Sequence, residues 1–359
     1  MIEIVSDNII SPLGFTTKEN YDNVKLSKSG IKQKDSLFGL DGKFSVAELE
    51  NEILNSEFET FFHKSSNNFT KLEKMVLLSV GKTIFDTDVK GNRTAFYFSS
   101  TKGELQENLW HTAKKIAEFF GNKNTPVVVS NACVSGLCAV IAAARAINSG
   151  RIDTAVVTGA DVLSKFTISG FSCLKALSSK PCRPFDIERN GLNLGEAAST
   201  IILKKSNKEN FICGSIRNDA YHISSPSKTA EGAVNALIDV LKNVNKDEIA
   251  FISAHGTATF FNDEMEANAI FQAGLSDVPV NGLKGCYGHT LGAAGLIETV
   301  LSFYALNSGE VLKTKGYETQ GVSKKINIAT ENLKTDKKYF IKLISGFGGV
   351  NAAAVFKKN

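Results

Sequence analysis

The stretch VVVSNACVSGLCAVIAAARAINSGRIDTAVVT, residues 127–158, decides the fold. It begins with β-branched residues at Val127–Ser130, continues through an alanine-rich segment at Cys133–Asn148, and returns to β-branched residues at Thr154–Thr158. This pattern predicts a strand, a helix and a second strand. A helix that connects two strands in this way places them parallel in one sheet, so we expect an α/β protein with a largely buried sheet.

The same alternation of strand and helix returns in the second half of the chain. A polar run, Lys204–Asn210, separates the two halves, and we expect one unit at residues 1–206 and another at 207–359. The second half should contain strands at Ile249–Ala254, Pro279–Asn281, Tyr339–Ile344 and Ala352–Phe356, with helices at Asp263–Ala273 and Leu291–Asn307.

The first hundred residues carry weaker patterns. We expect a helix at Leu72–Asp86, a strand at Thr94–Phe98 and irregular structure at Phe58–Asn68. Between residues 98 and 127 there is room for only one helix and a loop.

Composition narrows the class of protein. The 359 residues are 43% hydrophobic and 22% charged with a net charge of +4, which is typical of a globular chain. No dense basic run indicates nucleic-acid binding, and no apolar run approaches the roughly 18 residues of a membrane span. The six cysteines include no CxxC pair, so we expect no metal site. The start of the sequence lacks a signal-peptide pattern, and a cytoplasmic location is the expectation.

Cys133, in NACVSG, is the first candidate for chemistry. It stands between a strand and the start of a helix, where free N–H groups and the helix dipole favour a thiolate. A buried structural cysteine is the alternative, because free cysteines are among the most buried residues.

Two glycine-rich segments each contain a histidine. His255 lies in SAHGTAT, directly after a predicted strand, where α/β proteins commonly place functional residues. His289 lies in LKGCYGHTLGAAG, with Lys284 before it and Glu298 after it. The alternatives are a surface turn for the first segment and a closely packed helix with an incidental histidine for the second.

The turn SGFGGVN, residues 345–351, can present a backbone N–H to an oxyanion, although a tight hairpin explains it equally well. Taken together, a cysteine thiolate could accept an acyl group, and two neutral imidazoles could donate hydrogen bonds to an enolate oxygen. Claisen chemistry near neutral pH needs this combination.

Six motifs, in order, resemble the β-ketoacyl-acyl carrier protein synthases of the elongating type, which have the thiolase fold. The motifs are NACVSG (131–136), CRPFDIERNGLNLGEAA (182–198), NDAYHISSP (218–226), AHGTAT (254–259), KGCYGHTLGAAGLIE (284–298) and GFGGVN (346–351). The resemblance implies two similar βαβ halves in α-β-α-β-α layers, with the cysteine in the first half and both histidines in the second.

It also implies an acyltransferase that performs a decarboxylative Claisen condensation. An acyl-enzyme thioester would react with malonyl-acyl carrier protein to give a β-ketoacyl-acyl carrier protein, in fatty acid or polyketide/polyene biosynthesis. No cofactor is implied, because the carrier protein's phosphopantetheine arm holds the substrates. The implied partners are acyl carrier protein and a second subunit, in a homodimer or in a heterodimer with a related ketosynthase-like chain.

Carried over residue by residue, the family roles fall on a small set of positions. Cys133 would be acylated, His255 and His289 would hold the enolate, and Lys284 and Glu298 would support them. The N–H groups of Cys133 and Phe347 would form an oxyanion hole, with Phe347 also beside the acyl group, and Thr257 and Thr259 would line the phosphopantetheine arm.

The sequence departs from the family at several positions. The segment between residues 98 and 127 is short, Asn190 stands where aspartate is usual, and Ser345 and Val350 stand where phenylalanine and threonine are usual. Two alternatives remain: a chain-length-determining or partner subunit of a ketosynthase heterodimer, and a thiolase. The cysteine and both histidines argue against the first, and the lack of a cysteine in the 345–351 turn argues against the second.

Overall fold

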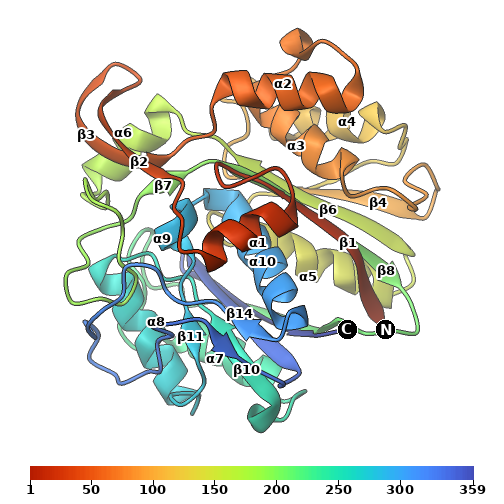
Figure 1. Cartoon of the computed structure of the whole chain (residues 1–359). Coiled ribbons are helices and arrows are strands. Elements are labelled where there is room, and N and C mark those ends of the chain that lie inside the picture. The colour runs from red at the N-terminus through yellow and green to blue at the C-terminus, as the bar shows by residue number, and fades with distance from the viewer.

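Two five-stranded sheets organise the chain, whose computed structural model describes residues 1–359 (Figure 1). The first sheet contains β1 (Ile2–Ile10), β4 (Thr94–Ser99), β5 (Val127–Val129), β6 (Thr154–Asp161) and β8 (Ala197–Lys205). The second contains β9 (Phe211–Asn218), β10 (Ile249–Ser253), β11 (Val280–Asn281), β14 (Tyr339–Gly346) and β15 (Val350–Lys357).

Both sheets have the same strand order and the same strand directions. The first runs β1-β8-β6-β4-β5 and the second runs β9-β15-β14-β10-β11. In each sheet the first three strands are antiparallel neighbours, and the last three are parallel neighbours. The prediction of two similar halves is therefore confirmed at the level of the sheets.

Helices form three layers around the two sheets, which gives the predicted α-β-α-β-α arrangement (Figure 1). The outer layer on the first sheet contains α2 (Asn51–Phe62), α3 (Lys71–Gly81) and α4 (Leu109–Phe119), and that on the second contains α7 (Glu231–Leu241) and α8 (Phe260–Gln272). The central layer contains α5 (Ser135–Asn148) and α10 (Ala294–Asn307), with α1 (Thr17–Lys25) against α10.

The central helices are buried nearly all round because they lie between the sheets. α5 is rich in alanine and α10 in leucine, and both belong to one cluster of 44 buried residues that contains strand residues from both sheets. Such a cluster stabilises both halves together, since its apolar surface leaves water only when both sheets are in place.

Shorter elements complete the fold. These are β2 (Ile31–Leu37), β3 (Leu40–Ala47), α6 (Lys165–Cys173), β7 (Leu194–Gly195), α9 (Lys284–Tyr287), β12 (Glu310–Val311), β13 (Leu333–Lys334) and the 3-10 turns η1 (Ser66–Asn68), η2 (Lys246–Glu248) and η3 (Leu291–Ala293). The sequence did not predict the β2–β3 hairpin, whose strands are largely exposed and therefore lack an apolar pattern. No helix combines the length and the hydropathy that crossing a bilayer requires.

Two predictions in the first hundred residues were wrong in part. Residues 58–62, expected to be irregular, form the end of α2, because Phe58 is buried and its ring packs against Phe62 and Phe69. The helix predicted to reach Asp86 ends at Gly81, where the Thr83 hydroxyl donates to the Ser79 carbonyl oxygen and competes with the helical pattern.

Candidate active site

A tight turn places Cys133 between β5 and α5. The backbone at Ala132 has φ of +47°, which side-chain-bearing residues rarely adopt. The Ser135 hydroxyl holds the turn, since it accepts from Asn131 N–H at 2.7 Å and donates to the Ala132 carbonyl oxygen at 2.6 Å. The helix begins at Ser135, two residues later than predicted, so Cys133 belongs to the turn.

His289 lies just before η3, and its backbone is fixed by the NLGEAA segment. Its N–H donates to the Asn193 carbonyl at 2.6 Å, and its carbonyl accepts from Gly195 N–H at 3.0 Å. A Cβ atom at Gly195 would lie 2.0 Å from the Tyr287 carbonyl oxygen, so the close approach of these two segments requires glycine.

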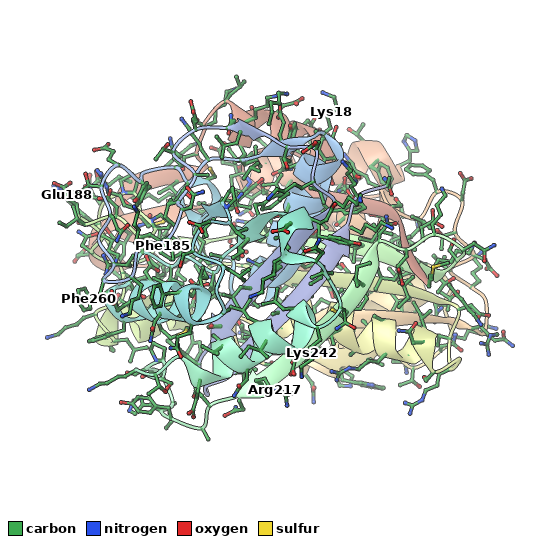
Figure 2. The ribbon with its side chains drawn as sticks, turned by 90° about the horizontal axis from the view of Figure 1, so that it is seen from below. Lys18, Phe185, Glu188, Arg217, Lys242 and Phe260 are labelled. Atoms are coloured by element: carbon green, nitrogen blue, oxygen red, sulfur yellow. The ribbon has the colours of Figure 1, made fainter.

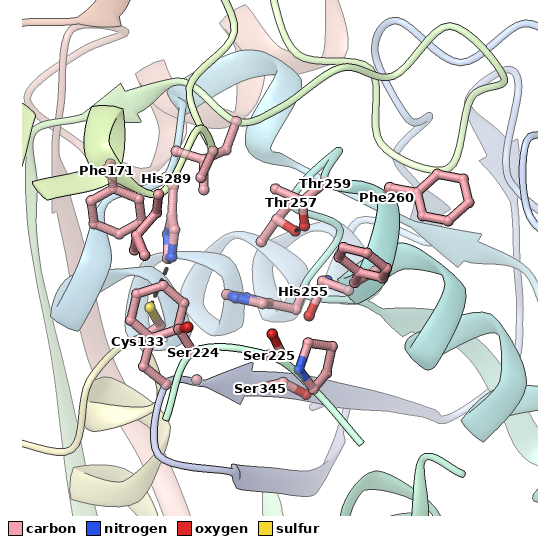
Figure 3. Close-up of a pocket in the computed structure, with 18 of the residues that line it drawn as sticks. Cys133, Phe171, Ser224, Ser225, His255, Thr257, Thr259, Phe260, His289 and Ser345 are labelled. Atoms are coloured by element: carbon pink, nitrogen blue, oxygen red, sulfur yellow. Dashed lines mark hydrogen bonds between the residues drawn. The ribbon is translucent and has the colours of Figure 1, made fainter. Parts of the chain in front are cut away.

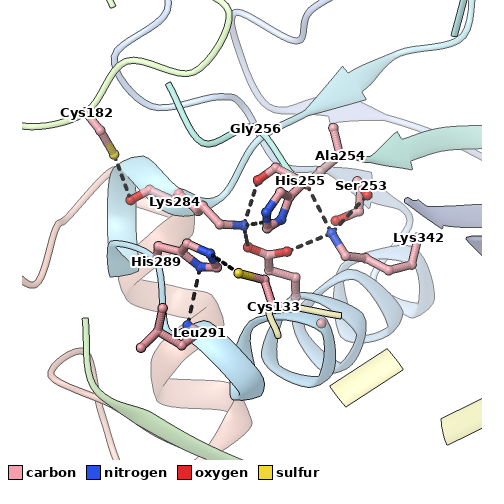
Figure 4. Close-up of polar contacts among 12 residues, drawn as sticks. Cys133, Cys182, Ser253, Ala254, His255, Gly256, Lys284, His289, Leu291 and Lys342 are labelled. Atoms are coloured by element: carbon pink, nitrogen blue, oxygen red, sulfur yellow. Dashed lines mark hydrogen bonds and ion pairs between the residues drawn. The ribbon is translucent and has the colours of Figure 1, made fainter. Parts of the chain in front are cut away.

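The ring of His289 is held in one tautomer. Its Nδ1 accepts from Leu291 N–H at 3.3 Å, so the proton of the neutral ring resides on Nε2. That Nε2 lies 3.0 Å from the Cys133 Sγ atom (Figure 4).

His255 follows β10, and its loop is tied to α8. The two oxygens of the Glu266 carboxyl accept from the N–H groups of His255 and Gly256 at 2.6 and 2.7 Å. Lys284 Nζ lies 3.1 Å from His255 Nδ1, which makes Nδ1 the acceptor and leaves the ring proton on Nε2. The centroids of the His255 and His289 rings lie 5.0 Å apart, with the rings nearly perpendicular.

A buried charge cluster supports both rings. Lys284 donates to the His255 carbonyl oxygen and to Glu298 Oε1, both at 2.6 Å. Glu298 Oε2 forms an ion pair with a second lysine, Lys342, at 2.7 Å, and neither lysine has any exposed surface. Removing one member of such a cluster costs about 3–5 kcal/mol, because a charge is left buried without its partner.

Both imidazoles are neutral at pH 7. Burial lowers the pKa of His255 and of His289 well below the ordinary 6.5, and the positive charge of Lys284 lowers each further. A neutral ring with its proton on Nε2 is a hydrogen-bond donor that carries no charge of its own. The two rings can therefore stabilise an oxygen that becomes negative during a reaction.

Cys133 is a buried thiol at neutral pH. Burial raises its pKa to about 12, although the charge of Lys284 and the N–H groups of Cys133 and Phe347, which point at the sulfur, act in the opposite direction. The thiolate expected from the position at the helix start is therefore disfavoured, because burying its charge is costly.

The side chains of Cys133, His255 and His289 lie at the base of a cavity of about 390 Å³ (Figure 3). Thr257 and Thr259 line the wall of this cavity, and their hydroxyl oxygens lie 2.8 Å apart. The Phe347 ring stacks on Phe171 of α6, with the centroids 5.7 Å apart.

Three exposed apolar side chains lie at the mouth of the cavity. Phe260 and Phe261, at the start of α8, are about two-thirds exposed, and Ile223 on the facing loop is 81% exposed. In Figure 2, Phe185 lies inward of Phe260, and its N–H donates to the Asp263 carboxyl of α8 at 2.7 Å.

Every residue singled out in the sequence lies in or directly behind this cavity. Cys133, His255, His289, Phe347 and both threonines line it, while Lys284 and Glu298 lie behind the histidines. Sequence reasoning missed Lys342 and Glu266. A signal for Lys342 was present, since it is the only charged residue in the apolar strand YFIKLISG, whereas Glu266 lies in an ordinary polar helix pattern.

Two of the residues that differ from the family pattern form hydrogen bonds with nearby side chains. Asn190 Oδ1 accepts from the Ser178 hydroxyl at 2.6 Å, and the Ser345 hydroxyl donates to Asn351 Oδ1 at 2.7 Å. Both residues line the cavity, so these substitutions change its wall and leave the cysteine and the histidines untouched.

Cys133, His255 and His289 offer donor atoms within 4.8 Å of one another, a spacing that a metal ion could bridge. Two fully buried lysines lie directly behind them, and Lys284 touches His255 Nδ1. Because positive charges repel a cation, this environment suits an anionic oxygen better than a metal.

Comparisons with known proteins agree with this geometry. Residues 78–209 match the family model of the beta-ketoacyl synthase N-terminal domain, and residues 212–318 match that of its C-terminal domain. The 3-oxoacyl-(acyl-carrier-protein) synthase 2 of Vibrio harveyi is 30% identical over 261 residues, and that of Vibrio cholerae is 29% identical over 262. Each alignment covers 66% of this chain and 63% of the relative, so it spans less than two thirds of either relative's length.

Solved structures share the whole fold. A ketosynthase in complex with its chain length factor from Xenorhabdus doucetiae has a TM-score of 0.86 and 23% identity, over 100% of this chain and 98% of that one. A β-ketoacyl synthase from Burkholderia phymatum has a TM-score of 0.86 and 20% identity, over 100% and 99%. With both domain models matched in order, and with the thiolase-like layers confirmed, this chain belongs to the β-ketoacyl synthase family.

Proposed function

We propose that this protein is a condensing acyltransferase that joins an acyl group on Cys133 to a malonyl unit with loss of carbon dioxide. The observation that carries this proposal is the convergence of a thiol and two neutral Nε2–H donors at the base of one cavity. Hydrolysis would need a base that activates water, and the fixed tautomers leave neither ring with a free acceptor nitrogen toward the cavity.

The first step transfers the acyl group to the enzyme. The Cys133 sulfur attacks an acyl thioester, the carbonyl oxygen becomes negative, and the N–H groups of Cys133 and Phe347 stabilise it. The thiol of the carrier is the leaving group, and it takes the proton that Cys133 gives up. A thioester on Cys133 thus replaces the thioester on the carrier.

The second step breaks and forms carbon–carbon bonds. A malonyl thioester loses carbon dioxide, and the electrons of the broken bond pass to an enolate whose oxygen accepts from His255 and His289. The enolate carbon attacks the acyl-Cys133 carbonyl, and collapse of the tetrahedral intermediate expels the Cys133 thiolate. Preorganised donors of this kind each contribute about 10²–10³-fold to such rates.

Replacement of the nucleophile tests the proposal. Cys133→Ala should lower elongation of an acyl primer by about 10⁴-fold or more, because no covalent intermediate can form. Cys138→Ala is the matched control, since Cys138 is also buried and lies on α5, five residues after Cys133, but does not line the cavity. Mass spectrometry of the intact protein should find the acyl group on the control and none on Cys133→Ala. Elongation by Cys133→Ala at the unaltered rate would refute the proposal.

The partners in this proposal are an acyl carrier protein and a second ketosynthase-like subunit. One similar structure is described as a type II polyketide synthase acyl-carrier protein in complex with its ketosynthase, and two others pair a ketosynthase with a chain length factor. The threonines along the cavity wall would contact the phosphopantetheine arm. Light scattering of the chain alone, compared with a complex co-expressed with a candidate sister subunit, separates a homodimer from a heterodimer.

The condensing function is preferred over the two alternatives. A subunit that only sets chain length would not need the Cys133–His289 contact or the lysines behind it. A thiolase would need a second cysteine in the cavity, and Cys133 is the only cysteine that lines it. The acyl chain, the pathway, the cytoplasmic location and a division at residue 206 stay predictions, and primers of graded length on carrier proteins would define the first two.

A further inference from the structure

Lys342 occupies the centre of the second sheet and has no exposed surface. Its Nζ donates to the carbonyl oxygens of Ser253 and Ala254, both at 3.0 Å, at the end of β10 (Figure 4). Burying an ammonium group is costly, so its retention within an apolar strand needs a compensating contact or a function.

The contacts of Lys342 lead directly to the reacting groups. Ser253 and Ala254 are the two residues before His255, so the ammonium group fixes the backbone from which that ring projects. Its remaining contact is the ion pair with Glu298, whose other oxygen binds Lys284. Lys284 in turn touches His255 Nδ1.

The positive charge of Lys342 has a second effect, on the net charge of the cluster. Lys284 and Glu298 alone would form a neutral pair, and Lys342 makes the cluster positive beside two imidazoles. A positive cluster opposes protonation of both rings. Glu266 also faces this cluster and accepts from the His255 backbone, and burial raises the pKa of Glu266 to about 7, so it offsets the positive charge only in part at neutral pH.

We propose that Lys342 is a positioning residue for the condensation, which holds the His255 loop and Glu298 in place and keeps both histidines in the neutral, donating form. This inference rests on the proposed function for its catalytic meaning, but its structural content does not depend on the reaction. The lysine lies in β14, outside the six motifs that resemble the family.

Burial and charge act in the same direction on the histidines. Burial is the main cause of the lowered pKa of both rings, and the charges of Lys284 and Lys342 lower it further. The groups that face Lys342 are Glu298 from α10, Lys284 from α9 and Glu266 from α8. None of these would replace the positive charge if Lys342 were neutral.

Histidine NMR tests the proposal without any substrate. The chain has five histidines, so selective carbon-13 labelling gives five ring signals. In the unmodified protein, the signals of His255 and His289 should not titrate down to pH 5. In Lys342→Met, the pKa of at least one of these two histidines should rise by about one unit. A His255 or His289 signal that titrates near 6.5 in the unmodified protein would overturn the proposal by itself.

Two further variants separate charge from packing. Lys342→Gln keeps donors for the two carbonyls but removes the charge, so it should fold more stably than Lys342→Met and still raise the histidine pKa. Lys74→Met is the matched control, because Lys74 is a largely buried lysine on α3, outside the cavity. It should leave the five histidine signals unchanged. Equal titration curves in Lys342→Gln and the unmodified protein would contradict the charge role.

Activity adds a readout that a purely structural role would not change. Release of carbon dioxide from a malonyl carrier protein by Lys342→Gln should fall about tenfold in kcat, with KM unchanged, and the fall should be larger at pH 6 than at pH 8. If the unmodified protein releases no carbon dioxide, the proposed function fails while the NMR result still decides the role of Lys342. A loss that is equal at both pH values would contradict the inference.

Discussion

The Glu266 carboxyl holds the His255 loop from a fully buried position. Its two oxygens accept from the N–H groups of His255 and Gly256, and Asn262 Nδ2 donates to it at 3.0 Å. Burial is the main cause of a pKa raised to about 7 from 4.5, and nearby Asp263, itself raised to about 6 by burial, adds to it. A carboxyl with this pKa changes protonation near neutral pH.

Replacing Glu266 should alter how stability depends on pH. A carboxyl whose pKa is higher in the folded state than in the unfolded state stabilises the fold when it is protonated. This contribution is fully present below the unfolded pKa, near 4.5, and is lost as pH rises through the folded pKa of about 7. Glu266→Gln lacks this pH-dependent contribution and loses one of the two acceptor oxygens. The variant should therefore be less stable than the unmodified protein at pH 5. The difference should shrink by up to about 3 kcal/mol at pH 8. Urea unfolding of both proteins at the two pH values measures it.

The control is Glu264→Gln, a neighbour on the same helix that is bonded only to the exposed Ser323. Its stability relative to the unmodified protein should be the same at both pH values. A constant difference between Glu266→Gln and the unmodified protein would show that Glu266 does not titrate as its burial requires.

At this scale the sequence predicted the residues and missed what holds them. Cys133, His255, His289, Lys284 and Glu298 stand in recognisable motifs, so the sequence singles them out without knowledge of the fold. Lys342 acts through contacts with residues 44 to 89 positions away, whereas Glu266 bonds to the loop ten and eleven positions before it but stands in an ordinary polar helix pattern. Their roles depend on the distance between β14, α8 and α10, which no local pattern contains.

At the scale of elements, the site depends on how closely α5 packs on α10. A Cβ atom at Gly136 would lie 2.8 Å from Leu296 N and 3.0 Å from the Gly292 carbonyl oxygen. A Cβ atom at Gly295 would likewise lie 2.8 Å from Leu137 N. Because these neighbours are backbone atoms, they cannot move aside without moving a helix. The contact thus fixes the distance between Cys133, just before α5, and His289, before α10.

Gly136→Ala should separate the two helices. The added methyl group overpacks the contact at a cost of about 1–3 kcal/mol, which exceeds the gain in helix propensity of up to about 1 kcal/mol. We expect a lower thermal midpoint and slower acylation of Cys133, measured by calorimetry and by mass spectrometry. The control is Gly170→Ala in α6, where a Cβ atom would meet nothing within 4 Å. That variant should gain about 0.5–1 kcal/mol, and a gain in Gly136→Ala as well would contradict the packing argument.

The elements themselves were predictable where they are buried. The strands and helices of residues 127–158 were found to within three residues at each boundary, because their apolar runs leave one interpretation. The β2–β3 hairpin was missed because its exposed faces have no apolar period. The end of α3 was misplaced by five residues, and the Thr83 hydroxyl there donates to the Ser79 carbonyl oxygen, a contact that the apolar pattern does not reveal.

On the scale of the whole molecule, the two halves share their core. Cys133 precedes the central helix of the first half and His289 precedes that of the second, so the site lies where equivalent points of two similar sheets meet. The sequence predicted two halves but could not predict that one 44-residue cluster spans both. That cluster joins residues more than a hundred positions apart, from Ile2 to Phe356.

The shared core predicts that both halves unfold together. Chains of this length commonly unfold one domain after another, but neither sheet here can keep its inner face buried once the other has left. The single tryptophan, Trp110 on α4, reports on the first half, and far-UV circular dichroism reports on the whole chain. Their guanidinium transitions should coincide. In a Trp110→Phe, Phe271→Trp variant the probe moves to half-exposed Phe271 of α8, and its midpoint should also match the dichroism. Separate midpoints for the two tryptophan positions would mean that each half is stable alone, and that the contact between Cys133 and His289 can open without unfolding either sheet.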